Sequence, residues 1–169
     1  MRLVYENQFQ TMPRTRISPR SQFDVLDKEI DIEEESRKMF YGSARVDLDV
    51  LVFETPPGSQ TDESNVERLV AAFGRAGCLS LHPQYHVPAI VTKGQIDEAI
   101  RNAASSRDAL LHHDPSRWPV VIFPDDFRVH CLHGRHRIEA AKQYLSISDR
   151  WWVVDFYLSG MWKVELRMR

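Results

Sequence analysis

The segment from Trp151 to Leu158 restricts the possible folds of this chain more than any other stretch. It is apolar at both odd and even positions, with Asp155 as the exception. Side chains of a strand alternate between two faces, so a strand that is apolar on both is typical of the interior of a covered sheet. We therefore predict a central strand here. The chain has 169 residues, enough for about one ordinary domain.

Other apolar runs predict further strands. Arg45 to Phe53 alternates loosely and ends in four apolar residues, and Val87 to Val91 is a short apolar run. Val120 to Leu132 is predicted to form a hairpin that turns at Pro124-Asp125-Asp126. These runs alternate with helical patterns along the chain. The order predicts an α/β fold, a single domain with a small mixed sheet flanked by helices.

Three segments have helical patterns. Ser64 and Glu67 form a predicted capping box before a helix that reaches Phe73, with Gly77 as its C-terminal cap. Thr92 to Gln95 repeats the capping-box pattern before a second helix. A third helix is predicted from about Arg135 to Leu145, because apolar residues recur on one side of it.

Charge divides the chain into three predicted regions. Residues 1–42 are an N-terminal extension, basic up to Arg20 and then acidic, with seven acids between Asp24 and Glu35. Residues 43–160 are the compact domain. Residues 161–169 alternate in polarity, which predicts an edge strand or tail and a possible homodimer contact.

Composition excludes some classes of protein. The formal net charge is -2, and the acidic block would repel nucleic acid, so DNA binding is possible but not favoured. No apolar run approaches the length of a membrane span. Two cysteines cannot form a disulfide scaffold. We therefore predict a protein of the cytoplasm or nucleus that does not enter a membrane.

The densest polar cluster lies where a predicted strand passes into a predicted helix. Glycine lets the backbone turn there, and the first N–H groups of a helix attract anions. Three basic residues in that first turn oppose the helix dipole, so a bound phosphate or carboxylate would compensate them. The candidate anion-binding residues are His133, Gly134, Arg135, His136 and Arg137.

Other interpretations of this cluster remain open. Arg137 could pair with an internal acid while its neighbours are solvated. His130, Cys131, His133 and His136 are zinc-compatible types, although their spacing does not favour a metal and no metal site is predicted. Cys131 could be a nucleophile activated by its basic neighbours, or a small core residue.

The tract from His133 to Ala141 resembles the helix start of the ParB N-terminal/sulfiredoxin superfamily, written Gly-x-His-Arg-x-x-Ala. The upstream order of strand, helix, glycine and strand is similar as well. The resemblance covers roughly residues 43–158, with an additional helical insert near 93–117. Details such as Gly77-Cys78 and Leu132-His133-Gly134 are similar to a fungal branch of that superfamily.

The resemblance implies a nucleotide-binding domain. Members bind nucleotide phosphates at this helix start, so the expected ligand is a nucleoside triphosphate or diphosphate with Mg²⁺. The free-serine kinases of the superfamily have a glutamate after the first strand that acts as general base on the substrate hydroxyl. Glu54 has a comparable position. Glu54 and His136 are therefore the candidate catalytic residues of an ATP- or CTP-dependent phosphotransferase or hydrolase. The alternatives are a nucleotide-gated module that binds DNA or a protein, and an interaction domain without catalysis.

Overall fold

We analysed a computed structural model, which describes residues 34, 36–54 and 62–159. Contacts divide the chain into two units, Met1–Glu35 and Ser36–Arg169. All strands and helices with defined bounds belong to the second unit. Most of the predicted extension, and the edge strand or tail predicted for residues 161–169, lie outside the described residues. The first strand begins at Phe40, within the predicted extension.

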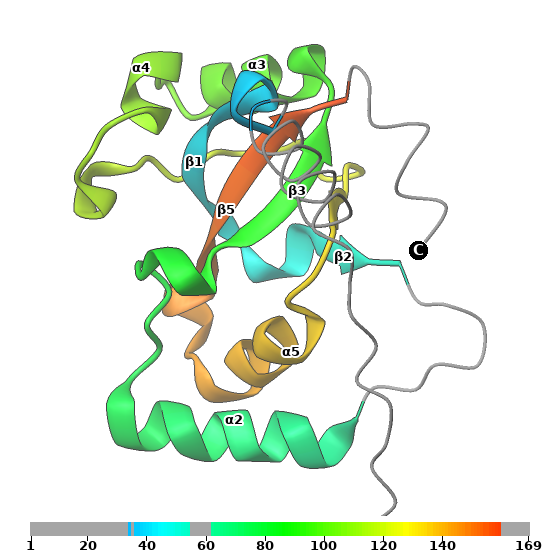
Figure 1. Cartoon of the computed structure of the whole chain (residues 1–169), viewed down its shortest axis with the longest axis vertical. Coiled ribbons are helices and arrows are strands. Elements are labelled where there is room, and N and C mark those ends of the chain that lie inside the picture. The colour runs from blue at the N-terminus through cyan, green and yellow to red at the C-terminus, as the bar shows by residue number, and fades with distance from the viewer. Residues whose placement is uncertain (1–33, 35, 55–61, 160–169) are drawn as a thin grey trace, which may run out of the picture. The chain divides into compact units, whose positions relative to one another are not determined.

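A mixed sheet of five strands forms the centre of this unit (Figure 1). The strand order is β1-β5-β3-β4-β2. Parallel pairing joins β3 to β5 and β2 to β4, and antiparallel pairing joins β1 to β5 and β3 to β4. The strands are β1 (Phe40–Asp47), β2 (Leu51–Phe53), β3 (Val87–Val91), β4 (Val129–Cys131) and β5 (Trp151–Leu158). The predicted α/β class, with a mixed sheet flanked by helices, is confirmed.

β5 is an interior strand, as its sequence predicts. It lies between β1 and β3 and has the predicted bounds. Trp152, Val154 and Phe156 point to one face and are at most 1% exposed. Val153 is fully buried on the other face, but Asp155 and Tyr157 on that face are only partly covered. The second face is therefore less completely covered than the first.

The single strand predicted from Arg45 to Phe53 is wrong. A 3-10 turn, η1 (Leu48–Val50), interrupts it, because the Asp47 carboxylate accepts a hydrogen bond from the Asp49 N–H at 2.8 Å. Leu48 turns fully inward at this point. The two halves, β1 and β2, become opposite edges of the same sheet.

This short link forces the sheet to curl. Four Cα steps join Asp47 to Leu51, and an extended chain covers about 14 Å in four steps. Four gaps between strands would separate the two edges of a flat sheet by about 19 Å. The ends of β1 and β2 must therefore approach each other across a curved sheet.

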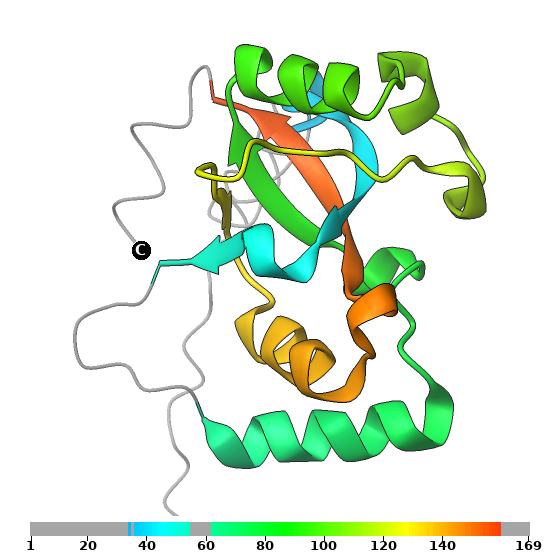
Figure 2. The same cartoon turned by 180° about the vertical axis from the view of Figure 1, so that it is seen from behind.

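The predicted hairpin is also wrong in its first half. Val120 makes only an isolated bridge with Arg45 of β1. The Ile122 N–H donates to the Ala99 carbonyl instead of to a strand, and the Phe123 and Phe127 rings stack at 5.0 Å between centroids. Burial of these aromatic rings carries the segment across one face of the sheet, as Figure 2 shows. Only β4 joins the sheet, and its partners are β2 and β3.

In the described part of the chain, four α-helices with bounds defined at both ends lie around the sheet. α2 and α5 lie side by side at one end of it, and α3 and α4 lie at the other (Figures 1 and 2). Among the described helices, none has the length and apolar character that crossing a bilayer requires. The helices are α2 (Glu63–Ala76), α3 (Lys93–Asn102), α4 (Arg107–Leu110) and α5 (Arg135–Tyr144).

The helix caps agree with the sequence in two of three cases. Thr92 and Gln95 make both hydrogen bonds of the predicted capping box at α3. Gly77 ends α2 with a φ of 77°, as predicted. The N-cap of α2 is Asp62 rather than Ser64. The Asp62 carboxylate accepts from the Asn65 N–H at 3.2 Å, and a carboxylate is favoured at a helix N-terminus.

Candidate functional site

The predicted anion site lies where β4 leads into α5. Gly134 is the N-cap of α5, with a φ of 101° in the left-handed region, and no side chain caps the helix. A Cβ at this position would lie 3.0 Å from a methyl group of Val87. Both observations require glycine here. The first turn of α5 contains Arg135, His136 and Arg137 and no acid.

His136 contacts the N-terminus of a second helix, α2. Its Nε2 accepts a hydrogen bond from the Asp62 N–H at 3.3 Å. Asp62 is the N-cap of α2, so the N-termini of α2 and α5 lie close together. A hydrogen bond from Ser64, and then the Asn65 N–H, hold the pKa of Asp62 below its usual value. The start of α2 therefore already has a carboxylate cap, whereas no side chain caps α5.

Arg137 faces a different neighbour. Its Nη1 donates to the Tyr85 carbonyl at 3.1 Å, and its guanidinium lies 5.1 Å from the centre of the Tyr85 ring. Burial lowers the pKa of Arg137. Among the described residues, no carboxylate lies within ion-pair distance of this guanidinium. Arg137 therefore links α5 to the turn η2 (Pro83–Tyr85).

Glu54 follows β2 directly and is exposed. β2 and β4 are parallel, with Phe53 opposite Cys131. The carboxyl ends of these two parallel strands therefore lie at the same end of the sheet, and the segments that follow them start there. The structure thus places Glu54 and the exposed His133 at the edge where α5 begins, but it shows no hydrogen bond between Glu54 and the basic residues.

The described contacts do not support a nucleophilic Cys131 or a metal site at this cluster. Cys131 is 5% exposed, and burial raises the pKa of its thiol to about 12, so it is a core residue rather than an activated nucleophile. Its neighbour His130 is exposed, because successive side chains of a strand point to opposite faces. Within the described residues, no three histidine, cysteine or acidic side chains could together hold a metal.

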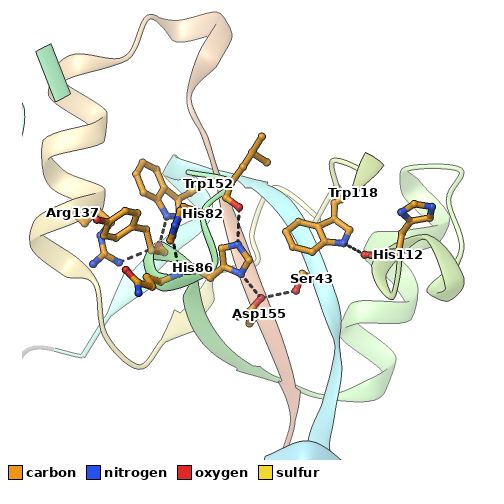
Figure 3. Close-up of polar contacts among 11 residues, drawn as sticks. Ser43, His82, His86, His112, Trp118, Arg137, Trp152 and Asp155 are labelled. Carbon is orange, nitrogen blue, oxygen red and sulfur yellow. Dashed lines mark hydrogen bonds and ion pairs between the residues drawn. The ribbon is translucent and has the colours of Figure 1, made fainter. Parts of the chain in front are cut away.

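A second polar cluster centres on Asp155. His86 Nδ1 lies 3.0 Å from Asp155 Oδ1, and Ser43 Oγ donates to the same oxygen at 2.5 Å (Figure 3). His86 Nε2 faces the Leu81 carbonyl at 3.4 Å, and the Trp118 ring packs edge-on against the imidazole. Ser43 and His86 are buried, at 4% and 7% exposed.

The order of contacts in this cluster excludes a hydrolytic triad. In a triad the serine hydroxyl contacts the imidazole, which takes its proton. Here the carboxylate lies between Ser43 and His86, so His86 does not contact the hydroxyl it would have to activate. The cluster therefore satisfies buried polar groups and orients Asp155.

A cavity of about 350 Å³ opens beside this cluster. Asp155 and His86 supply its polar wall, and His133 connects it to the segment that leads into α5. The remaining lining is mainly apolar. The described lining residues are Ser36, Pro83, Gln84, His86, Pro88, Ile90, Leu132, His133, Asp155 and Tyr157.

Residues 39–169, which include all five strands, the start of α5 and most of the cavity lining, match a protein family. Its description is "Protein of unknown function (DUF3723) N-terminal domain". The chain belongs to the DUF3723 N-terminal domain family. No curated protein and no solved structure matches the chain.

The sequence patterns of this DUF3723 N-terminal domain did not predict the Asp155 cluster. The three residues come from β1, from the segment before β3 and from β5, so no local motif joins them. One signal was available, since Asp155 is the polar exception in an otherwise apolar strand. An acid in such a strand needs a buried partner or an opening to solvent, and Asp155 has both.

Proposed function

We propose that this domain binds the phosphates of a nucleotide at the start of α5. The observation that carries the proposal is the Gly134 cap in the left-handed conformation, with no side-chain cap and with Arg135, His136 and Arg137 in the first turn. N–H groups at a helix start favour anions, and arginine matches the geometry of phosphate oxygens. A phosphate group would add negative charge at a helix turn that contains no acidic residue of its own.

The charges around the turn support the same ligand. Basic side chains at a helix N-terminus oppose the helix dipole. Arg137 is partly buried without a carboxylate partner among the described residues. The proposed ligand, a nucleoside triphosphate or diphosphate with Mg²⁺, also agrees with the resemblance to the ParB/sulfiredoxin superfamily. The free thiols of Cys78 and Cys131 accord with the nucleotide-rich, reducing cytoplasm or nucleus.

Nucleotide binding is tested by thermal unfolding and by titration calorimetry with Mg²⁺ and ATP, ADP, CTP or GTP. A nucleotide at about a hundred times its Kd is expected to raise Tm by about 5–10 °C. Arg135→Gln and Arg137→Gln are each expected to weaken binding about tenfold or more, because each removes a charged hydrogen-bond donor.

The matched control is Arg75→Gln. Arg75 is exposed in the last turn of α2, away from the helix start. It is expected to keep the wild-type affinity. Because Arg137 also holds Tyr85, the compared quantity is the Kd of folded protein rather than Tm. Full affinity in both variants, or no binding of any nucleotide to wild type, would overturn the proposal.

We further propose that Glu54 acts as general base in phosphoryl transfer or hydrolysis at this site, with His136 beside the transferred group. β2 and β4 are parallel and adjacent, so Glu54 and the segment that leads into α5 follow neighbouring strand ends, which supports a position of Glu54 near the phosphate site. Glu54→Gln is expected to lower the rate of nucleotide turnover about a hundredfold, as loss of a general base does, and to leave the nucleotide Kd unchanged. Phosphate or nucleoside diphosphate release measures the rate. Equal rates in the variant and wild type would exclude the catalytic role.

A further inference from the structure

The cavity beside Asp155 has the size and lining of a small-molecule site. Its volume of about 350 Å³ lies within the range of ligand pockets, roughly 300–1,000 Å³. Pro88 and Ile90 of β3 and Tyr157 of β5 form part of the wall, and Leu132 adds an exposed apolar side chain. A small apolar body can therefore pack against this lining.

One acidic group breaks the apolar character of the wall. Both hydrogen bonds of Asp155, from Ser43 and from His86, end on Oδ1. Within the described part of the chain, Oδ2 has no hydrogen-bond partner. The Asp155 side chain is 23% exposed and lines the cavity. The carboxylate is thus held in one orientation with an acceptor left over for a ligand.

Among the described lining residues, none places a fixed positive charge beside this carboxylate. The described lining contains no lysine and no arginine. His86 contacts Asp155 through Oδ1 and directs its other ring nitrogen to the Leu81 carbonyl, so it does not occupy Oδ2. His133 is exposed at the rim, and Gln84 is uncharged.

From these contacts we propose that the cavity binds a small organic cation, a primary ammonium carried on an apolar body. The ammonium donates hydrogen bonds to Asp155 Oδ2, and the body packs on Pro88, Ile90 and Leu132. A charged donor and a charged acceptor in a partly desolvated pocket make one of the stronger hydrogen bonds in proteins. Ser43 and His86 hold the carboxylate in place before the ligand arrives.

The cavity adjoins the proposed phosphate site through His133 but binds a ligand of opposite charge. An isolated carboxylate repels phosphate, so the nucleotide phosphates at the start of α5 are not its ligand. The inference does not rest on nucleotide binding, and each proposal can fail without the other.

The test is a chemical-shift titration of the full chain with butylamine and with benzylamine. Benzyl alcohol and benzoate are the neutral and anionic counterparts of benzylamine. We expect saturable shifts with the amines and binding at least about tenfold weaker for the alcohol and benzoate. Asp155→Asn keeps an oxygen for Ser43 and His86 but removes the charge, so it is expected to weaken amine binding about tenfold or more.

Glu98→Gln is the matched control, because Glu98 is an exposed acid on α3 that does not line the cavity. It is expected to bind the amines like wild type. If Asp155→Asn does not fold, Ile90→Phe tests the proposal instead. The phenylalanine side chain fills the cavity without altering the carboxylate, so this variant should show no chemical-shift changes when the amines are added. Unchanged amine affinity in a folded Asp155→Asn or Ile90→Phe protein, equal binding of benzyl alcohol, or no saturable amine binding to wild type would overturn the proposal.

Discussion

Replacing Trp152 by alanine is expected to lower the free energy of unfolding by about 3–5 kcal/mol. Trp152 is 1% exposed, and its indole N–H donates to the Tyr85 carbonyl at 2.8 Å. Its ring lies 6.1 Å from that of Phe73 on α2. The substitution therefore leaves a large cavity between β5 and α2 and removes a hydrogen bond. Small domains have only about 5–15 kcal/mol of stability in total.

The neighbouring Trp151→Ala variant is the control. Trp151 points to the opposite face of β5, is partly exposed, and packs against the Arg45 guanidinium at 4.7 Å. Its loss is expected to cost about 1 kcal/mol, the scale of an exposed cation–π contact. Urea unfolding followed by far-ultraviolet circular dichroism measures both variants. Equal losses for the two tryptophans would contradict the assignment of Trp152 to the core.

Gly42→Ala is expected to lower the free energy of unfolding by about 2–5 kcal/mol. Gly42 lies at the irregularity in the register of β1, with a φ of 143°. A Cβ there would lie 2.6 Å from the Cβ of Leu110 and 3.1 Å from its carbonyl carbon and oxygen. Overpacking costs about 1–3 kcal/mol, and a backbone conformation that disfavours L side chains costs about 1–2 kcal/mol more.

Gly94→Ala is a control in which the free energy of unfolding is expected to rise rather than fall. Gly94 lies in α3, and an added Cβ would meet no atom within 4 Å. Alanine in a helix is favoured over glycine by about 0.5–1 kcal/mol, so this variant is expected to be slightly more stable than wild type. Thermal unfolding of both variants gives the comparison. A Gly42→Ala protein as stable as Gly94→Ala would show that β1 and α4 separate at no cost.

Local patterns in the sequence predict the elements whose interactions are local. α3 begins where its capping box places it, because Thr92 and Gln95 bond to backbone groups within four residues. β3 and β5 have the predicted bounds, because polar residues flank both apolar runs. The start of α5 was likewise visible from Gly134 and the residues that follow it.

The errors come from interactions between distant residues. In the apolar run from Val120 to Phe123, Val121 and Phe123 are buried, but the run does not pair with β4, and its composition is the same in either case. The break at Leu48 depends on the hydrogen bond from the Asp49 N–H to the Asp47 carboxylate, two residues away. The pattern of apolar residues does not reveal such a short turn. The Asp155 cluster joins residues 69 and 112 positions apart, so only the isolated acid in β5 indicated it.

The order of strands in the sheet determines when this domain can fold during its synthesis. β1 and β2 leave the ribosome early, but in the described sheet the neighbouring strand of β1 is β5 and that of β2 is β4. Contacts of such long sequence separation form slowly, since loop closure precedes any gain from pairing. The sheet cannot be completed until Leu158 has been made. Until then the nascent chain carries unpaired strand edges, which are prone to aggregate.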